Sequence, residues 1–435
     1  SYDMSTTVTM DSPHTATAHF LSKYALLFPH VLETSTWNSH IQIFNPADST
    51  ASAMIQCYDN SGNLLNSYST YLAPRASIAV KPRDVNNGIK FIGSVIVGSD
   101  QPLTGLYRYT NVAGTMVDSY NALTSTQNDL YFPHVFENSN WASTIMLLNP
   151  SSSAADVTIQ VFNDLGTLLN TYKTIIPAYA KVQAQPRQFN NDHKFVGSLV
   201  VQSDVGLAGC QIHMNTGYTV TGAFSVGRRP STILYYPHVF ENSRWSSYVV
   251  LFNPSSSQAS VAIKAYNYVG KLLNVYSTTI QPHAKLGAKP RTFNNGIEFV
   301  GSLIVESTQG LVGYLGGSNA DGTVTFAYIA SAIALKTINP PHVIHTTSWA
   351  GYVVIFNPSN SAAHITVYVY DASGNLLNAY TASIQPHAKL GAAPTTFNKG
   401  KYFTGSLVID SDQPTVFYFA YSSASGSMMG CYTIP

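Results

Sequence analysis

Hydrophobic and polar residues alternate along short stretches of this chain. The stretch 155–162 reads ADVTIQVF, with Val157, Ile159 and Val161 separated by polar residues. A period of two predicts a half-buried β-strand. The following Asn-Asp-Leu-Gly at 163–166 predicts a turn, because these residues tolerate turn dihedrals, and Leu168–Ile176 predicts the returning strand. Further strands are predicted at 141–148, 195–203, 206–214 and 219–226.

The same pattern returns with a period of 104 residues. Pro-His-Val begins at Pro29, Pro133, Pro237 and Pro341, and the only tryptophans are Trp37, Trp141, Trp245 and Trp349. Asn-Pro pairs at Asn45, Asn149, Asn253 and Asn357 keep the same interval. We therefore divide the chain into an N-terminal arm at 1–26 and repeats at 27–130, 131–234, 235–338 and 339–435. A unit of this length can bury its own core, so four tandem domains fit better than one solenoid.

Helical patterning is nearly absent, and Gly, Pro and Asn stand at the breaks between strands. This predicts an all-β chain of four tandem β-sandwich domains. An immunoglobulin-like Greek key is the favoured version, although the sequence does not fix the strand order and the antibody-type cysteine pair is missing.

One repeat also resembles a known class of module. Pro-His-Val, six residues, Trp, a strand ending in Asn-Pro-Ser, an alternating strand and a Gly-x-Leu-Leu turn are similar to the tandem immunoglobulin-like β-sandwich modules of bacterial secreted and cell-surface proteins. The resemblance covers residues 27–435 and implies an extracellular, surface-associated role. It carries over no catalytic residue.

The composition of the chain argues against two kinds of partner, nucleic acids and membranes. The 435 residues are 10% charged, with a formal net charge of +1. The sequence has no basic tract, so it does not predict nucleic-acid binding. The sequence contains no run of about 18 apolar residues, so it predicts no membrane span. Cys57, Cys210 and Cys431 fall at different places in the repeat, so we expect buried, unpaired thiols. A chain that begins at Ser1 is expected to be a mature, secreted product.

The recurring histidines are candidate metal ligands: His30, His134, His238 and His342. An acid follows three positions later in the first three repeats, at Glu33, Glu137 and Glu241, whereas the fourth repeat has His345. Two ligands per repeat are too few for a closed site, so a structural role is the alternative. A ring of domains would let the four histidines meet at one axis, and a linear string would hold them apart.

The four tryptophans are candidate ligand-binding residues, because an exposed indole offers a flat apolar face for stacking. A tryptophan at the start of a core strand is also common as buried packing. Lys285 and Lys389 follow His283 and His387 in a Pro-His-Ala-Lys-Leu segment, which we interpret as a solvated loop absent from the other repeats.

The arm contains a β-prone run, Thr6, Thr7, Val8, Thr9 and Met10. Three outcomes stay open for it: completing a sandwich of its own chain, inserting into a neighbouring copy, or disorder.

No catalytic signature and no cofactor motif occurs, so we do not expect an enzyme. The favoured function is an extracellular structural or adhesive surface protein that self-associates into a filament or lattice, since low charge weakens repulsion between copies. The alternative is a glycan-binding, lectin-like array of modules that uses the repeated Trp and His positions.

Overall fold

The computed structural model describes residues 23–227 and 229–434, which are almost entirely β-strand with four short helical turns. The predicted all-β fold of tandem sandwiches is confirmed. The run from Thr6 to Met10 lies outside the described residues.

The first sandwich consists of β1 (Tyr24–Leu32), β2 (Trp37–Phe44), β3 (Ala51–Tyr58), β4 (Leu64–Leu72), β5 (Ser77–Val80), α1 (Pro82–Val85), β6 (Ile92–Ser99), β7 (Thr104–Asn111) and β8 (Val117–Asn121). Its two four-stranded antiparallel sheets have the orders β1-β6-β3-β4 and β5-β2-β7-β8. Side chains alternate inward and outward along strands such as β3, as the period of two predicts.

The next two sandwiches repeat this plan. The second contains β9 (Gln127–Phe136), β10 (Trp141–Leu148), β11 (Ala155–Asn163), β12 (Leu168–Ile176), β13 (Lys181–Ala184), η1 (Pro186–Phe189), β14 (Val196–Asn215) and β15 (Thr221–Val226). The third contains β16 (Ser231–Phe240), β17 (Trp245–Phe252), β18 (Ala259–Asn267), β19 (Leu272–Ile280), β20 (Lys285–Ala288), η2 (Pro290–Asn294), β21 (Val300–Asn319) and β22 (Thr325–Ile329).

The fourth sandwich contains β23 (Leu335–Ile338), β24 (Val343–His345), β25 (Trp349–Phe356), β26 (Ala363–Tyr370), β27 (Leu376–Ile384), β28 (Lys389–Ala392), α2 (Pro394–Phe397), β29 (Phe403–Ser423) and β30 (Met429–Thr433). Here, as in the second and third sandwiches, one long strand replaces the pair β6 and β7 and takes part in both sheets. The first strand of the second sandwich begins at Gln127, so the structure starts this unit four residues before the boundary placed at 131.

Two sequence landmarks have local structural causes. Pro29 and His30 sit where the register between β1 and β6 shifts, between Phe28 and Val31. Proline is tolerated at such an irregularity because it has no N–H to donate to the ladder. The Asn of each Asn-Pro pair is fully buried, and the Nδ2 of Asn149 donates to the carbonyls of Ser153, Ile176 and Pro177 at 2.7, 3.0 and 3.1 Å.

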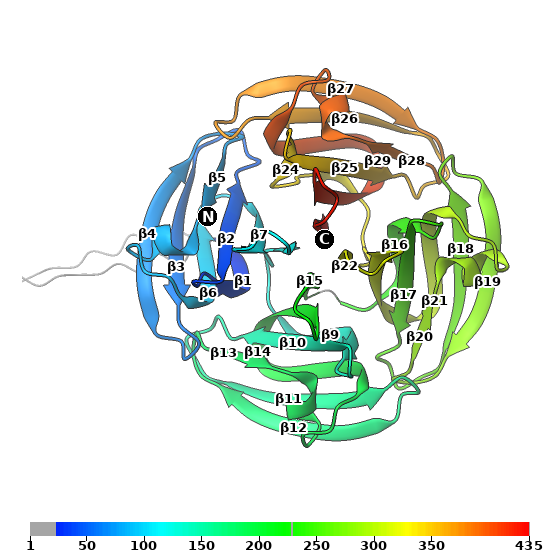
Figure 1. Cartoon of the computed structure of the whole chain (residues 1–435), viewed down its shortest axis with the longest axis horizontal. Helices are drawn as coiled ribbons and strands as arrows, with labels where there is room; N and C mark the ends of the chain where they lie inside the picture. The colour runs from blue at the N-terminus through cyan, green and yellow to red at the C-terminus, as the bar shows by residue number, and fades with distance from the viewer. Residues whose placement is uncertain (1–22, 228, 435) are drawn as a thin grey trace, which may run out of the picture.

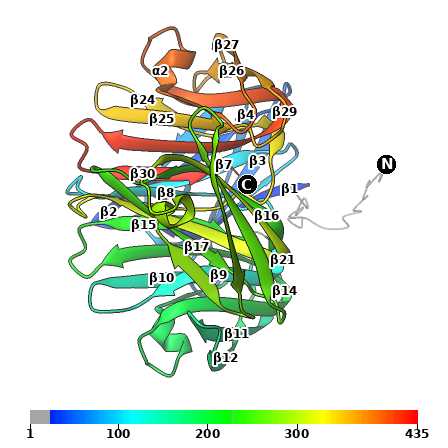
Figure 2. The same cartoon turned by 90° about the vertical axis from the view of Figure 1, so that its right-hand side faces the viewer.

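The four sandwiches close into a ring around a central axis (Figure 1). The turn after β3, β11, β18 or β26 meets the next sandwich: the N–H of Lys181 donates to Asn60 O at 3.1 Å, and the N–H of Ser77 closes the circle on Ala372 O at 2.9 Å. Seen from the side, the strands run between the two end faces of the ring (Figure 2).

The last strands of the sandwiches lie around the axis (Figure 1), where β8, β15, β22 and β30 pack in a circle. Side chains tie them together: Thr325 Oγ1 donates to Thr221 O at 2.9 Å, and Cys431 Sγ donates to Ala327 O at 3.3 Å. Each hydrophobic core also takes residues from the following sandwich, such as Met146 in the core of the first. The ring is therefore one packed body rather than a string of beads.

The three cysteines are free and buried, as expected. Within the described residues, no helix is long and apolar enough to cross a membrane.

Candidate functional site

The four histidines do not meet at the axis; each lies at the boundary between two neighbouring sandwiches. A lysine of the following sandwich reaches the Nδ1 atom of three of them. The Nζ···Nδ1 distances are 2.7 Å for Lys181 and His30, 2.9 Å for Lys285 and His134, and 2.9 Å for Lys389 and His238.

These lysines are not solvated, so our interpretation of Lys285 and Lys389 as part of a solvated loop is wrong. Lys389 is 4% exposed, and Lys285 Nζ also donates to Gly197 O at 2.7 Å. Lys285 carries an ion pair with Asp164 at 3.0 Å, whereas no carboxylate of the described residues pairs with Lys181. Burial lowers the pKa of Lys285 to about 8 and that of Lys181 to about 7.

The neighbouring histidines also contact the preceding sandwich. His283 stacks on Phe162 with ring centroids 4.5 Å apart, and His387 stacks on Tyr266 at 4.6 Å. The aligned Tyr179 stacks on Tyr58 at 5.0 Å. The segment is thus a general interface feature, contrary to the sequence interpretation.

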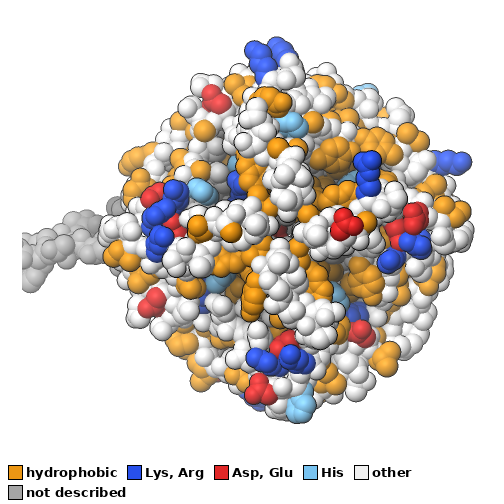
Figure 3. All heavy atoms as spheres, in the orientation of Figure 1, with side chains coloured by type: hydrophobic (Ala, Val, Ile, Leu, Met, Phe, Trp, Pro, Cys, Tyr) orange, Lys and Arg blue, Asp and Glu red, His pale blue; other side chains and the backbone are white. Residues whose placement is uncertain are grey.

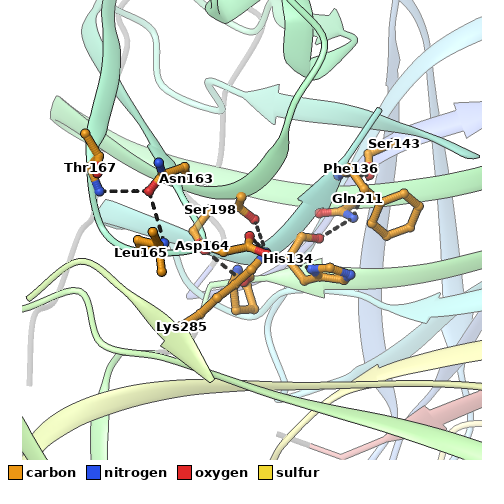
Figure 4. A network of polar contacts seen from close by, with 12 residues as sticks. His134, Phe136, Ser143, Asn163, Asp164, Leu165, Thr167, Ser198, Gln211 and Lys285 are labelled. Atoms are coloured by element: carbon orange, nitrogen blue, oxygen red, sulfur yellow. Dashed lines mark hydrogen bonds and ion pairs between the residues drawn. The ribbon is translucent and has the colours of Figure 1, made fainter. Parts of the chain in front are cut away.

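Burial, followed by the charge of the lysine, holds the pKa of His134 and of His238 well below its ordinary value, so both imidazoles are neutral near pH 7. Because Nδ1 of His134 accepts a hydrogen bond from Lys285 (Figure 4), the ring hydrogen belongs on Nε2. Nε2 has no protein partner among the described residues, and it therefore offers a fixed donor.

The acids that follow the histidines do not complete a metal site. Glu137 instead accepts from the backbone N–H of Arg187 at 3.1 Å and pairs with its Nε at 3.4 Å. Where the fourth repeat has His345 in place of the acid, Thr395 replaces the arginine. The described residues include no group of three or more His, Cys, Asp or Glu that could hold a metal ion.

Each tryptophan begins a strand, β2, β10, β17 or β25, and is partly buried. Trp141 packs edge-on against Phe136 at 6.2 Å and against His213 at 6.0 Å. Trp141 lines the same cavity as His134, and Trp245 the same cavity as His238, so in the second and third repeats the predicted Trp lies near the predicted His.

We name the boundaries by the histidine they contain: the first cleft (His30), second cleft (His134), third cleft (His238) and fourth cleft (His342). The second cleft is a cavity of about 430 Å³, lined on one side by His134, Phe136, Asn138 and Trp141 and on the other by Tyr248, Tyr314 and Gly316. The third is a cavity of about 410 Å³, lined by the aligned His238, Phe240, Asn242 and Trp245 and by Tyr352, Tyr418 and Ala420. End-on, hydrophobic side chains gather in hollows between the sandwiches (Figure 3).

The imidazole sits among aromatic rings in both cavities. The ring centroid of His134 is 5.4 Å from that of Tyr314 and 6.1 Å from that of Tyr248. The same distances for His238 are 5.4 Å to Tyr418 and 5.9 Å to Tyr352. The two cavities are thus copies of one design.

One alignment position distinguishes these open clefts from the others. It is Gly316 in the second cleft and Ala420 in the third, but Ile212 in the first and Arg108 in the fourth. A Cβ at Gly316 would lie 2.5 Å from Tyr314 Oη, so the glycine also makes room for that tyrosine. The histidines follow the same division: His30 and His342 are 4% and 3% exposed, whereas His134 and His238 are partly open to solvent.

The fourth cleft differs further. Its lysine position is Ser77, and the guanidinium of Arg108 lies 4.2 Å from the ring centroid of Trp349 and 5.3 Å from that of Tyr421.

No family model and no curated protein matches this chain. Among solved structures, Thermotoga maritima 1070 is 14% identical, with 23% of this chain and 94% of that chain covered and a TM-score of 0.21. The Anabaena sensory rhodopsin transducer is 18% identical, with 20% and 94% covered and a TM-score of 0.17. PNGF-II is 7% identical, with 86% and 98% covered and a TM-score of 0.15. Scores this low give no basis for transferring a fold or a function.

The sequence analysis missed some cleft residues and misinterpreted others. Lys181, Lys285 and Lys389 recur at the period of 104 residues, and this spacing was a usable signal. A weaker signal was a tyrosine two residues before a small residue at one position of the repeat. It occurs only in the third and fourth repeats, as Tyr314 with Gly316 and as Tyr418 with Ala420.

Proposed function

We propose that this protein is a saccharide-binding ring that binds one saccharide ligand in each of its two open clefts. The observation that carries the proposal is the duplicated design: the second and third clefts present the same Trp, Phe, His and Asn against a Tyr pair from the next sandwich.

The chemistry of both cavities fits a pyranose. A pyranose has an apolar C–H face, which packs on aromatic rings, and hydroxyl groups, which need hydrogen-bonding partners. Trp141, Tyr248 and Tyr314 supply the rings, and Asn138 and the Nε2–H of His134 supply polar contacts. Volumes of about 430 and 410 Å³ suit a ligand of one or two sugar rings.

The binding groups argue for an uncharged ligand. Among the described residues, no carboxylate lines either cavity and no charged residue lines the third cleft, and the imidazoles are neutral. Burying an unpaired ligand charge there would cost free energy, whereas hydroxyl groups can be matched.

The extracellular, adhesive setting implied by the resemblance to bacterial surface modules belongs to the same proposal. Two sites on one rigid ring would gain avidity on a glycan-coated surface. Self-association is proposed only through the outer surface, because the heterologous faces between sandwiches are already used in closing the ring.

The test is a glycan array followed by calorimetric titration of the full chain. We expect two sites, and Trp245→Ala should weaken binding at one of them at least tenfold, which is about 1.4 kcal/mol. Trp349→Ala is the matched control, because Arg108 already covers that indole, and it should leave sugar binding unchanged. Equal losses in both variants, or no ligand on the array, would contradict the proposal.

A further inference from the structure

One wall of each cleft is a row of three side chains on neighbouring strands of the following sandwich. In the second cleft this row is Lys289, Tyr248 and Gly316, all of which line the cavity. The aligned rows are Ala393, Tyr352 and Ala420 in the third cleft and Gln185, Thr144 and Ile212 in the first.

In the fourth cleft the row is entirely basic: Lys81, His40 and Arg108. His40 on β2 and Arg108 on β7 are direct cross-strand partners, so their side chains leave the same face of the sheet. Lys81 follows the end of β5, whose Val80 pairs with Ile41 next to His40. All three side chains are partly open to solvent.

The guanidinium of Arg108 is held by stacking and not by charge pairing. It lies over Trp349 and Tyr421, while its buried Nε has no hydrogen-bond acceptor within residues 23–227 and 229–434. No carboxylate of the described residues is within ion-pair distance of it. Stacking fixes the plane of a guanidinium and leaves its N–H edge free, which is the geometry that binds a carboxylate or sulfate through two hydrogen bonds.

His342 stands on the opposite wall with a second unused group. It is 3% exposed, and its Nε2 has no hydrogen-bond partner in the part of the chain that the structure describes. In the other three clefts a lysine reaches the other ring nitrogen, Nδ1, of the aligned histidine, but here Ser77 takes the place of that lysine.

The acids near this row do not neutralise it. Glu33 and Asp84 both act electrostatically on His40. Glu33 forms an ion pair with Arg83, whose Nε lies 2.9 Å from the Glu33 carboxylate, and Asp84 is exposed on α1. Burial, and then the charges of Arg108 and Lys81, lower the pKa of His40, so the positive charge of the fourth cleft comes from Lys81 and Arg108. No charged residue among those described lines the third cleft.

We propose that the fourth cleft is an oxyanion site, in which the stacked Arg108 binds a carboxylate or sulfate group with Lys81 and His40 beside it and His342 facing it. The uronate carboxylate or sulfate ester of an acidic saccharide and free inorganic sulfate share this chemistry. The site is independent of the neutral sugar sites proposed for the second and third clefts.

The test is calorimetric titration of the full chain with sodium sulfate, sodium glucuronate and methyl glucoside, at ionic strength held constant with sodium chloride. Wild-type protein should bind sulfate or glucuronate at one site, and Arg108→Met should weaken this binding by about 10- to 100-fold, as expected for losing a charge-assisted contact. Glucuronate binding tighter than sulfate identifies a saccharide carboxylate as the ligand, and the reverse order identifies sulfate.

Two further variants separate this site from a purely structural arginine. Arg108→Lys keeps the charge without the fork and should retain only part of the affinity. Lys289→Met removes a basic residue from the aligned row of the second cleft and should have no effect on anion binding. Equal anion binding in wild type and Arg108→Met would mean an adventitious ion only and would overturn the proposal. Methyl glucoside binding should be the same in both proteins, so a failed sugar proposal is recognised separately.

Discussion

Lys181 provides a direct test of the buried lysine–histidine pairs. Lys181 is 6% exposed, and its ammonium has no carboxylate partner among the described residues. Burial lowers the pKa of this ammonium from 10.5 to about 7. In the unfolded chain the same group keeps its proton up to about pH 10.5. Between these two values the unfolded state binds more protons than the folded state, so the free energy of unfolding rises with pH.

The size of the effect follows from this shift. Below pH 7 the folded protein bears the full cost of burying the charge, and this cost falls by about 1.4 kcal/mol per pH unit above pH 7. Integrated from pH 6 to pH 8.5, one such lysine contributes a rise of about 2 kcal/mol. Lys181→Met removes this contribution. Its stability relative to wild type should therefore be most favourable at pH 6 and should fall by about 2 kcal/mol at pH 8.5.

The assay is urea unfolding followed by tryptophan fluorescence at several pH values from 6 to 8.5, with wild type and variant compared at each pH so that other titrating groups cancel. Ser77→Met is the matched control, because it places the same side chain at the aligned position of the fourth cleft, where there is no lysine. Its difference from wild type should not vary with pH. A flat difference for Lys181→Met, or one that grows more favourable with rising pH, would refute the reasoning.

Three further changes test the ring and its clefts. In thermal melts, Gly166→Ala should destabilise the protein by about 2 kcal/mol or more, because φ is +85° and the new Cβ would lie 2.2 Å from Pro282 O of the next sandwich. The control Gly296→Ala, with φ of +82° and nothing within 4 Å of the new Cβ, should cost only about 1 kcal/mol in the same measurement. Asn253→Ala removes a buried amide that donates to the carbonyls of Ser257, Ile280 and Gln281, so calorimetry should show a loss of about 2–4 kcal/mol, and a loss below about 0.5 kcal/mol would contradict this role. Ala420→Ile copies the residue that fills the first cleft, and titration with the saccharide found on the array should then give one site in place of two; an unchanged count of two would show that the third cleft is not used.

The periodicity of the chain determined much of the fold. Alternation such as that in β11 predicts strands because one face of a sheet is buried and the other is not. The Asn-Pro and Pro-His positions recur because each solves a local problem, a strand ending or an irregular register, that depends on nearby chain. The 104-residue interval likewise predicted four equivalent units.

The tertiary structure decided what those units do to one another. The solvated-loop interpretation of Lys285 failed because its partners, His134 and Gly197, lie 151 and 88 residues away, on a sandwich brought alongside only by the ring. Which clefts stay open depends on Gly316, Ala420, Ile212 and Arg108, and a single sequence does not show that these four positions face a neighbouring tryptophan. Strand pairing is local and periodic and can be read along the chain, whereas burial between domains is set by which surfaces meet when the ring closes.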